Sequence, residues 1–267
     1  MAAEGILAGR RGLIMGVAND HSIAWAIAKA CHEAGATLGF TYQGDAMLKR
    51  VRPLAESIGA DFLENCDVTA EGDQERVFER IGKEWDRLDF VVHAIAFSDK
   101  NELKGRYVDT TVENFTRTME ISCYSFTETA RCAAPLMTDG GSLLTLSFSG
   151  AERWMPSYNV MGVAKAALET SVRYLAVDLG RESIRVNAIS AGPMRTVSGA
   201  AVGDARYVFG YVRDHAPLMR AITHEDVGGA GVYFLSDLST GVTGEVHHVD
   251  AGYNVIGMMN PHQLDKD

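Results

Sequence analysis

Short apolar segments alternate along the chain with segments in which apolar residues recur every three or four positions. The apolar segments have the length of buried strands, and the periodic segments between them have helical spacing. The strands are expected at 12–15, 36–42, 61–66, 90–96, 142–147, 184–189 and 245–249, and the helices between the first of them at 22–33, 46–58 and 73–85. This alternation predicts an α/β fold in which about seven parallel strands are covered by helices on both faces.

One segment interrupts the alternation, and no linker or repeat divides the chain. Residues 194–217 are rich in small side chains at 198–203 and then in aromatic ones. The segment follows the strand expected at 184–189, and open α/β sheets bind ligands beyond the carboxyl ends of their strands. We therefore expect residues 1–267 to form a single domain in which 194–217 cover a ligand. A surface helix pair without such a role would show the same pattern.

Composition and charge exclude several classes of protein. A chain of 267 residues with 46% hydrophobic and 22% charged residues has the size and composition of a globular enzyme. Its formal net charge of −10 would repel a phosphate backbone, so no nucleic-acid partner is expected. Because no apolar run has the length of a membrane span and residues 1–11 lack the apolar region of a signal peptide, we expect a cytoplasmic protein without a membrane partner.

The cysteines and histidines do not have the spacing of metal ligands. The four cysteines share no CxxC motif and are expected to be reduced thiols in the core. His247 and His248 are adjacent on an expected strand, so their rings would point to opposite faces. No metal site is therefore predicted.

Tyr158 and Lys165 form the most informative pair in the sequence. Seven helical steps of 100° sweep roughly 700°, so both side chains would return to nearly the same face of a helix, about 10 Å apart along its axis. A phenol and an ammonium on one face can together polarise a carbonyl oxygen. An amphipathic helix that carries the two residues by chance has the same spacing.

The turn after the first strand has the small residues that a dinucleotide needs for close approach. In the segment 16–24, Gly16 would allow a tight turn, Ala18 is small, and Ser22 could cap the following helix and offer its hydroxyl to a pyrophosphate. The segment is not G-x-G-x-x-G, because Gly16 is its only glycine. Together with the alternating strands and helices, it predicts a Rossmann-type, doubly wound sheet.

Polar and small residues end the next strands. Gln43 stands where an acidic residue usually binds the adenosine ribose, and an amide cannot neutralise a 2′-phosphate, so NADH is favoured over NADPH. Asp67 could accept a hydrogen bond from the adenine amino group, or it could cap a helix from Thr69 onward. Ile95 lies between two alanines at the end of the fourth strand, where a cofactor backbone would pass closely.

These segments together resemble the short-chain dehydrogenase/reductase superfamily, and more narrowly its divergent branch of bacterial enoyl-acyl-carrier-protein reductases. The similarity extends over about 12–252 and rests on the Tyr158–Lys165 pair, with x6 between the two residues, and on the segments 16–18, 22–24, 40–43, 66–68, 150–153 and 185–193. Ketoreductases of the superfamily have Tyr-x3-Lys, and Met161 occupies the position where they would need the tyrosine.

The resemblance implies a function and a set of site residues. It implies reduction of the 2,3 double bond of enoyl-acyl-carrier-protein thioesters with NADH, the last reductive step of fatty acid elongation. Tyr158 and Lys165 would be catalytic, the phenol donating to the enolate oxygen. The residues implied to bind the cofactor are Gly16, Ser22, Ile23, Gln43, Asp67, Val68, Ile95, Lys165, Met194, Arg195, Thr196, Val197 and Ser198, and those implied to contact the substrate are Ser98, Phe148 and Tyr158.

The resemblance also implies partners. These are the acyl carrier protein, for which Arg195, Arg206 and Arg213 are candidate contacts, and a homotetramer built on long helices at 112–137 and 157–180. Phe148 departs from the family, many of whose members have a second tyrosine at this position. An inactive homologue that binds the cofactor therefore stays open as an alternative. A reductase of another activated alkene or ketone is the other alternative, and the Tyr158–Lys165 spacing weighs against a ketone.

Overall fold

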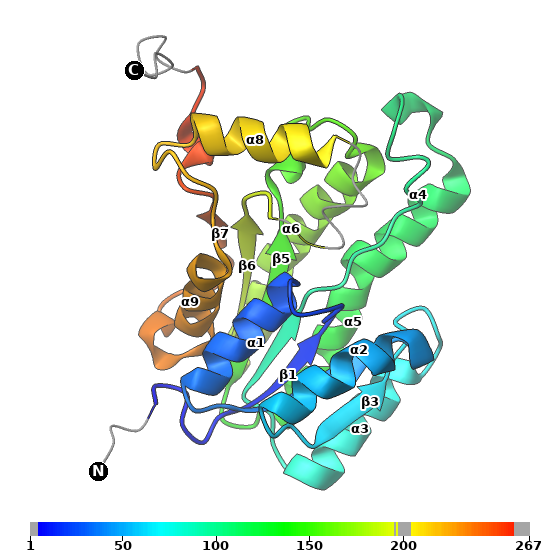
Figure 1. Cartoon of the computed structure of the whole chain (residues 1–267). Helices are drawn as coiled ribbons and strands as arrows, with labels where there is room; N and C mark the ends of the chain where they lie inside the picture. The colour runs from blue at the N-terminus through cyan, green and yellow to red at the C-terminus, as the bar shows by residue number, and fades with distance from the viewer. Residues whose placement is uncertain (1–4, 195, 197–203, 259–267) are drawn as a thin grey trace.

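Seven parallel strands form one sheet at the centre of the fold (Figure 1). The computed structural model describes residues 5–194, 196 and 204–258. The strands lie in the order β3-β2-β1-β4-β5-β6-β7, and all six neighbouring pairs are parallel. Their bounds are β1 Arg11–Met15, β2 Thr37–Tyr42, β3 Phe62–Asn65, β4 Phe90–His93, β5 Gly141–Ser147, β6 Ile184–Ala191 and β7 Val246–Val249. The sheet confirms the predicted α/β, Rossmann-type fold.

Helices cover both faces of the sheet. One hydrophobic core joins the sheet to α1, α2 and α9, and the other joins it to α3, α5 and α6. In Figure 1, α8 crosses above the sheet. The helix bounds are α1 Ile23–Glu33, α2 Gly44–Ser57, α3 Asp73–Trp85, α4 Val112–Met119, α5 Ser125–Ala133, α6 Asn159–Leu179, α8 Ala205–His215 and α9 His224–Leu235. The described residues also form six short 3-10 turns, η1 Tyr107–Asp109, η3 Ala134–Leu136, η4 Ser149–Ala151, η5 Gly180–Glu182, η6 Asp237–Ser239 and η7 Tyr253–Val255.

Alternation along β1 explains why its sequence is apolar at every position from Leu13 to Met15. Leu13 and Met15 belong to the core on one face, whereas Ile14 belongs to the core on the other, and all three are fully buried. Successive side chains of a strand point to opposite faces, so a strand covered on both sides is apolar throughout. The strands can be recognised in the sequence because burial on both faces makes them continuously apolar.

Two predicted elements differ from the structure. The strand expected at 90–96 ends at His93, and residues 94–96 continue as a loop. The helix implied for 112–137 is interrupted by a π-helical turn, η2 (Glu120–Tyr124), between α4 and α5. The two differences are connected, because Ser122 in this turn accepts a hydrogen bond from the Phe97 N–H and donates one to the Phe97 carbonyl. The wider turn thus binds the loop that follows β4.

No helix in the described ranges is long and apolar enough to cross a membrane.

Helices α1 and α9 pack so closely that glycine is required at their contact. A Cβ added to Gly231 would lie 2.8 Å from Cγ2 of Ile27, a side chain that is fully buried. We expect Gly231→Ala to lower the free energy of unfolding by about 1–3 kcal/mol, the usual cost of overpacking a core. Gly229 lies on the same helix with open space around it. Gly229→Ala should therefore raise the free energy of unfolding, by roughly 0.5–1 kcal/mol, through helix propensity.

Urea unfolding of the two variants provides the measurement. Equal free energies of unfolding for Gly231→Ala and Gly229→Ala would show that the α1–α9 contact does not require glycine.

Candidate active site

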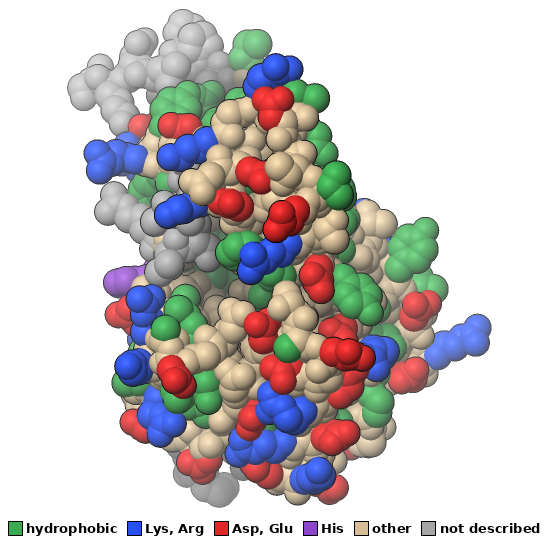
Figure 2. Space-filling view, turned by 90° about the vertical axis from the view of Figure 1, so that its right-hand side faces the viewer, with side chains coloured by type: hydrophobic (Ala, Val, Ile, Leu, Met, Phe, Trp, Pro, Cys, Tyr) green, Lys and Arg blue, Asp and Glu red, His purple; other side chains and the backbone are tan. Residues whose placement is uncertain are grey.

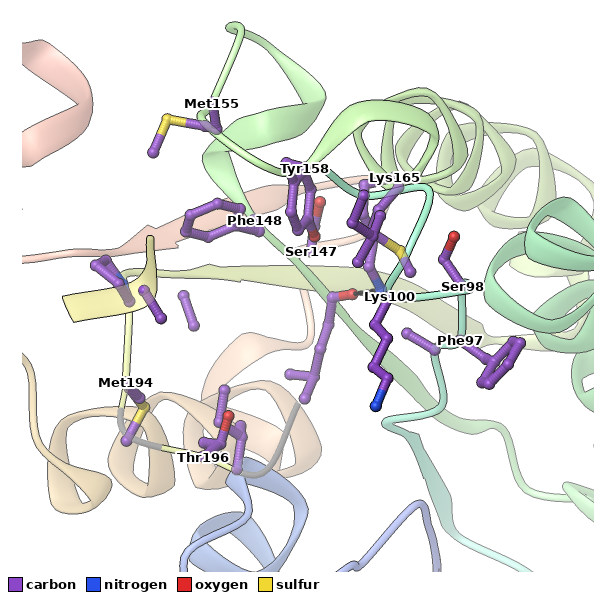
Figure 3. A pocket seen from close by; sticks show the side chains of 18 of the residues that line it. Phe97, Ser98, Lys100, Ser147, Phe148, Met155, Tyr158, Lys165, Met194 and Thr196 are labelled. Atoms are coloured by element: carbon purple, nitrogen blue, oxygen red, sulfur yellow. Dashed lines mark hydrogen bonds between the residues drawn. The ribbon is translucent and has the colours of Figure 1, made fainter. Parts of the chain in front are cut away.

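A cavity of about 1440 Å³ opens beyond the carboxyl ends of β1, β4, β5 and β6 (Figure 3). Typical sites for one small ligand measure about 300–1,000 Å³, so this space is large enough for part of a dinucleotide and a second ligand. In Figure 3, Phe148 and Tyr158 lie at the top of the cavity, Phe97 and Ser98 on the right, and Met194 and Thr196 below them on the left. Of the predicted site residues, it brings together Gly16, Ser22, Ile23, Ile95, Ser98, Phe148, Tyr158, Lys165, Met194 and Thr196.

Three predicted cofactor residues lie outside the described part of the chain. These are Arg195, Val197 and Ser198. Of the covering segment expected at 194–217, the described residues of α8 line the cavity on its outer side with Ala205, Arg206, Val208 and Phe209.

The turn after β1 has the geometry that Gly16 was predicted to provide. Gly16 has φ +94°, and a Cβ there would lie 2.3 Å from the Ala94 carbonyl oxygen. The predicted side-chain cap by Ser22 is wrong, because its hydroxyl donates to the Asn19 carbonyl oxygen at 2.6 Å. Ile23 begins α1 and lines the cavity, so the helix start faces the space where an anion would bind.

Gln43 and Asp67 are hydrogen-bonded to each other beyond the ends of β2 and β3. The Gln43 amide donates to Asp67 Oδ2 at 2.8 Å, and Thr69 donates through its N–H and hydroxyl to Oδ1. Burial opposes the charge, but the bonds from Thr69 and Gln43 outweigh it and lower the pKa of Asp67. Asp67 does not cap a helix, since α3 begins at Asp73, so that alternative is wrong. Neither residue lines the cavity, and neither does the adjacent Val68.

Tyr158 precedes α6 rather than lying within it. It is the N-cap residue, between Ser157 with φ +54° and Asn159 with φ +33°, both in the strained left-handed region. Their side chains fix this turn: Ser157 donates to Asp204 Oδ2 at 2.9 Å, and Asn159 donates to the Glu102 carbonyl at 3.0 Å. The prediction of two residues on one helix is therefore wrong for Tyr158, although both residues reach the cavity.

The Tyr158 ring is closely packed. It meets the Phe148 ring edge-on, with 5.0 Å between centroids, and a Cβ added to Gly150 would lie 2.4 Å from its Cδ1. Burial raises the pKa of Tyr158, and the charge of Glu169 raises it further. The phenol is therefore a neutral donor near pH 7, and its hydroxyl has no hydrogen-bond partner among the described residues.

Lys165 lies two turns along α6 with a buried ammonium. Its Nζ donates to the Leu146 carbonyl oxygen at 2.7 Å, the bond drawn in Figure 3. Burial lowers the pKa of Lys165 to about 8, while Cys123 and Glu169 act in the opposite direction. An ammonium has three donors, so two are left for ligand hydroxyls.

Ser98 lines the cavity, and its hydroxyl belongs to a network of hydrogen bonds with other polar side chains. Its hydroxyl donates to Asn114 Oδ1 at 3.3 Å and accepts from the Thr118 hydroxyl at 3.0 Å. Asn114 is a cavity residue that the sequence reasoning missed, together with an apolar wall of Leu103, Met155, Met161, Val208 and Phe209. Most of these lie in loops or on α8, where apolar residues follow no period that would indicate a common site.

The described ranges contain no group of three or more His, Cys, Asp or Glu side chains placed to hold a metal ion.

Comparison with known proteins places the chain in a family. A sequence model of the family described as "Enoyl-(Acyl carrier protein) reductase" matches residues 16–254. The chain belongs to this enoyl reductase family. It is 61% identical to the protein named "Enoyl-[acyl-carrier-protein] reductase [NADH] 2" from Rhizobium meliloti (strain 1021), over 96% of this chain and 95% of that protein.

Solved structures of the enoyl reductase family have the same fold. A reductase from Anaplasma phagocytophilum in complex with NAD is 55% identical, with a TM-score of 0.93 over 97% of this chain and 99% of that one. A reductase from Bacillus cereus with NADP+ and an indole naphthyridinone is 47% identical, with a TM-score of 0.93 over 95% of this chain and 100% of that one.

Replacing Lys165 by methionine should change how stability depends on pH. Because its pKa is lowered from 10.5 to about 8, the unfolded chain binds more protons than the folded chain between these values. The unchanged protein should therefore gain about 3 kcal/mol in free energy of unfolding relative to Lys165→Met as the pH rises from about 8 to 10.5. Urea unfolding of both proteins over this pH range measures the gain. If the difference in free energy of unfolding between the two proteins did not change with pH, the lowered pKa of Lys165 would be contradicted.

Proposed function

We propose that the protein reduces the 2,3 double bond of enoyl-acyl-carrier-protein thioesters with NADH, the last reductive step of fatty acid elongation. The observation that supports this best is that Tyr158 and Lys165 line one cavity that also reaches Gly16 and the apolar wall. The cavity thus joins a turn suited to a pyrophosphate, a pair of hydrogen-bond donors and a space for an acyl chain. The R. meliloti relative is named as an NADH-dependent enoyl reductase.

The residues present fit a dinucleotide without a 2′-phosphate. A Cβ at Gly16 would collide with the Ala94 carbonyl, so this turn, with a φ of +94°, requires glycine, and no side chain there would keep a pyrophosphate away from the backbone. Gln43 is bonded to Asp67, whose lowered pKa keeps a negative charge beside the expected ribose position. This charge would repel a 2′-phosphate and supports NADH over NADPH.

The chain's own residues have separate tasks in this proposal. Bound NADH supplies the hydride that is added to the β-carbon of the substrate. Tyr158 keeps its proton because of its raised pKa and donates a hydrogen bond to the enolate oxygen that develops. Lys165 donates to the ribose hydroxyls and fixes the cofactor relative to the phenol. Phe148 occupies the position of the second tyrosine of many relatives and packs against the Tyr158 ring, so its role here is to hold that ring and exclude water.

Tyr158→Phe should lower kcat for enoyl thioesters by about 10²–10³, the usual effect of removing one donor to a developing oxyanion. NADH affinity and the free energy of unfolding should stay unchanged. The matched control is Tyr174→Phe, which removes a phenol hydroxyl from an exposed position on α6 and should leave kcat unchanged. Initial rates with crotonyl and longer enoyl thioesters, and with a panel of ketones, provide the measurement.

Full turnover of enoyl thioesters by Tyr158→Phe would exclude the phenol as the donor. Turnover of ketones alone by the unchanged protein would exclude the proposed substrate class.

The proposal includes docking of an acidic carrier protein at the α8 side of the cavity. Figure 2 shows Lys and Arg side chains beside the hollow on this face of the molecule, with acidic side chains among them and below the hollow. Arg206 is exposed at the rim of the cavity. Arg213 is bound by both oxygens of Asp214, so its charge is largely compensated. Arg206 is therefore the better candidate of the two, and Arg195 lies outside the described residues.

Arg206→Glu should raise KM for carrier-linked enoyl substrate by at least about fivefold, the size of an exposed charge contact of about 1 kcal/mol. KM for the coenzyme A thioester should change little, because it has no carrier surface. Arg213→Glu is the matched variant and should have a smaller effect. Equal changes in KM for both thioesters would argue against docking through Arg206.

The proposal also includes assembly as a homotetramer that acts in the cytoplasm. Exposed apolar side chains on η2 and α6 support an interface with further copies, namely Tyr124, Tyr174 and Val177. The four cysteines are free thiols, which is usual for a reducing compartment.

A further inference from the structure

The last two residues of β5 are both bound to α6 beside the active site. The Leu146 carbonyl accepts from Lys165 Nζ at 2.7 Å, and the Ser147 hydroxyl donates to Glu169 Oε1 at 2.5 Å. Lys165 and Glu169 are four positions apart on α6, so their side chains lie on the same face, one turn apart. The two contacts form a clasp between strand and helix.

The clasp contains an ammonium and a carboxylate that are both buried. Lys165 and Glu169 each expose 7% of their surface. A buried charge is costly unless a group of opposite charge compensates it. Within the described residues the Lys165 ammonium has the Leu146 carbonyl as its one hydrogen-bond partner, and a carbonyl dipole compensates only part of the charge. A carboxylate close by would therefore stabilise the charged form of this amine.

The groups around the clasp leave few sources for that anion. Lys165 is influenced by Cys123 of η2 and by Glu169, and it in turn influences His93 of β4. Glu169 is influenced by Glu152 after η4, by Arg173 of α6 and by His248 of β7, and it also acts on Tyr158. Of the two groups that act to raise the pKa of Lys165, Cys123 has the larger influence and Glu169 is the carboxylate. The Ser147 hydroxyl stabilises the charged form of Glu169 against burial, which raises its pKa.

We propose that Glu169 is a positioning residue for Lys165: its carboxylate, fixed by the Ser147 hydroxyl, is the anion that keeps the buried amine protonated and directed toward the cofactor ribose. This role deepens the proposed reduction and rests on it for its catalytic consequence. Its effect on cofactor binding stands independently of the substrate. Glu169 acts through Lys165 and does not touch the reacting atoms.

The proposal fixes the direction of a change in pH dependence. Loss of the carboxylate charge would lower the pKa of Lys165 further below its present value of about 8. The fraction of protonated Lys165 would then fall at a lower pH, so the alkaline limb of NADH affinity would move to lower pH. The same loss would lower the pKa of Tyr158, but that pKa is raised above that of an ordinary phenol, so Tyr158 does not set this limb.

The experiment compares Glu169→Gln with the unchanged protein. Glutamine keeps a hydrogen-bond acceptor for Ser147 and removes the charge. We expect the alkaline limb of NADH affinity, measured by fluorescence titration without any thioester, to move down by at least about half a pH unit, as expected for a charge one helical turn away at a partly buried site. The alkaline limb of kcat/KM for an enoyl thioester should move in the same direction.

Three further variants separate the effect of the Glu169 charge from the effects of a distant charge, of the Ser147 hydroxyl and of the Cys123 thiol. Asp178→Asn removes one carboxylate from an exposed position on the same helix, about 20 Å along its axis from Lys165, and should leave the limb in place. Ser147→Ala keeps the charge and should move the limb less than Glu169→Gln. Cys123→Ala tests the thiol, and it too should leave the limb in place.

An unmoved alkaline limb in Glu169→Gln, or a limb that moves in Cys123→Ala instead, would overturn the proposal. If Glu169→Gln does not fold, Glu169→Met provides the test, because methionine removes the charge and fills a similar volume. A limb in Glu169→Met that equals that of the unchanged protein would then count against the role. Absence of turnover with every enoyl thioester would refute the proposed function alone, since the NADH titrations contain no substrate.

Discussion

A parallel sheet that is buried on both faces leaves its carboxyl edge as the place where polar groups can gather. The two cores take up every side chain of β1 from Leu13 to Met15, so no ligand can reach the strand from above or below. The cavity, the turn at Gly16 and the phenol of Tyr158 all lie beyond that edge. The position of the site thus follows from burial of the sheet, before any catalytic residue is considered.

The proposed chemistry at that edge depends on two ionisable side chains, Tyr158 and Lys165, that the fold buries. Burial raises the pKa of Tyr158 and lowers that of Lys165, so it favours the neutral form of each group: the phenol keeps its proton, and the ammonium comes closer to losing its own. Both shifts result from the same packing of α6 against β5 and Phe148. The family relationship indicates which reaction uses this arrangement, and the geometry indicates why a neutral donor and a weakly held cation suit it.

The sequence predicts the sheet well because strand burial is a local pattern, and α3 was predicted with its observed bounds, Asp73–Trp85. It predicts the site less well, because the decisive contacts are distant in sequence. Ser22 lies at the predicted start of the helix, but its hydroxyl donates a hydrogen bond to the Asn19 carbonyl and does not cap the helix. The interruption of the long helix at η2 is accompanied by hydrogen bonds between Ser122 and Phe97, a contact that no helical period could reveal. Tyr158 was placed inside α6, since spacing alone does not show the left-handed residues that flank it.

Ser157 and Asn159, which flank Tyr158, connect it to two segments that line the cavity. Ser157 is fastened to Asp204, where α8 begins, and Asn159 is fastened to Glu102 in the loop that leads toward α4. Tyr158 is therefore held on both sides by contacts with two segments that line the cavity. In the proposed function the acyl chain would pass between these segments, so any displacement of either one by a bound substrate would also displace the phenol.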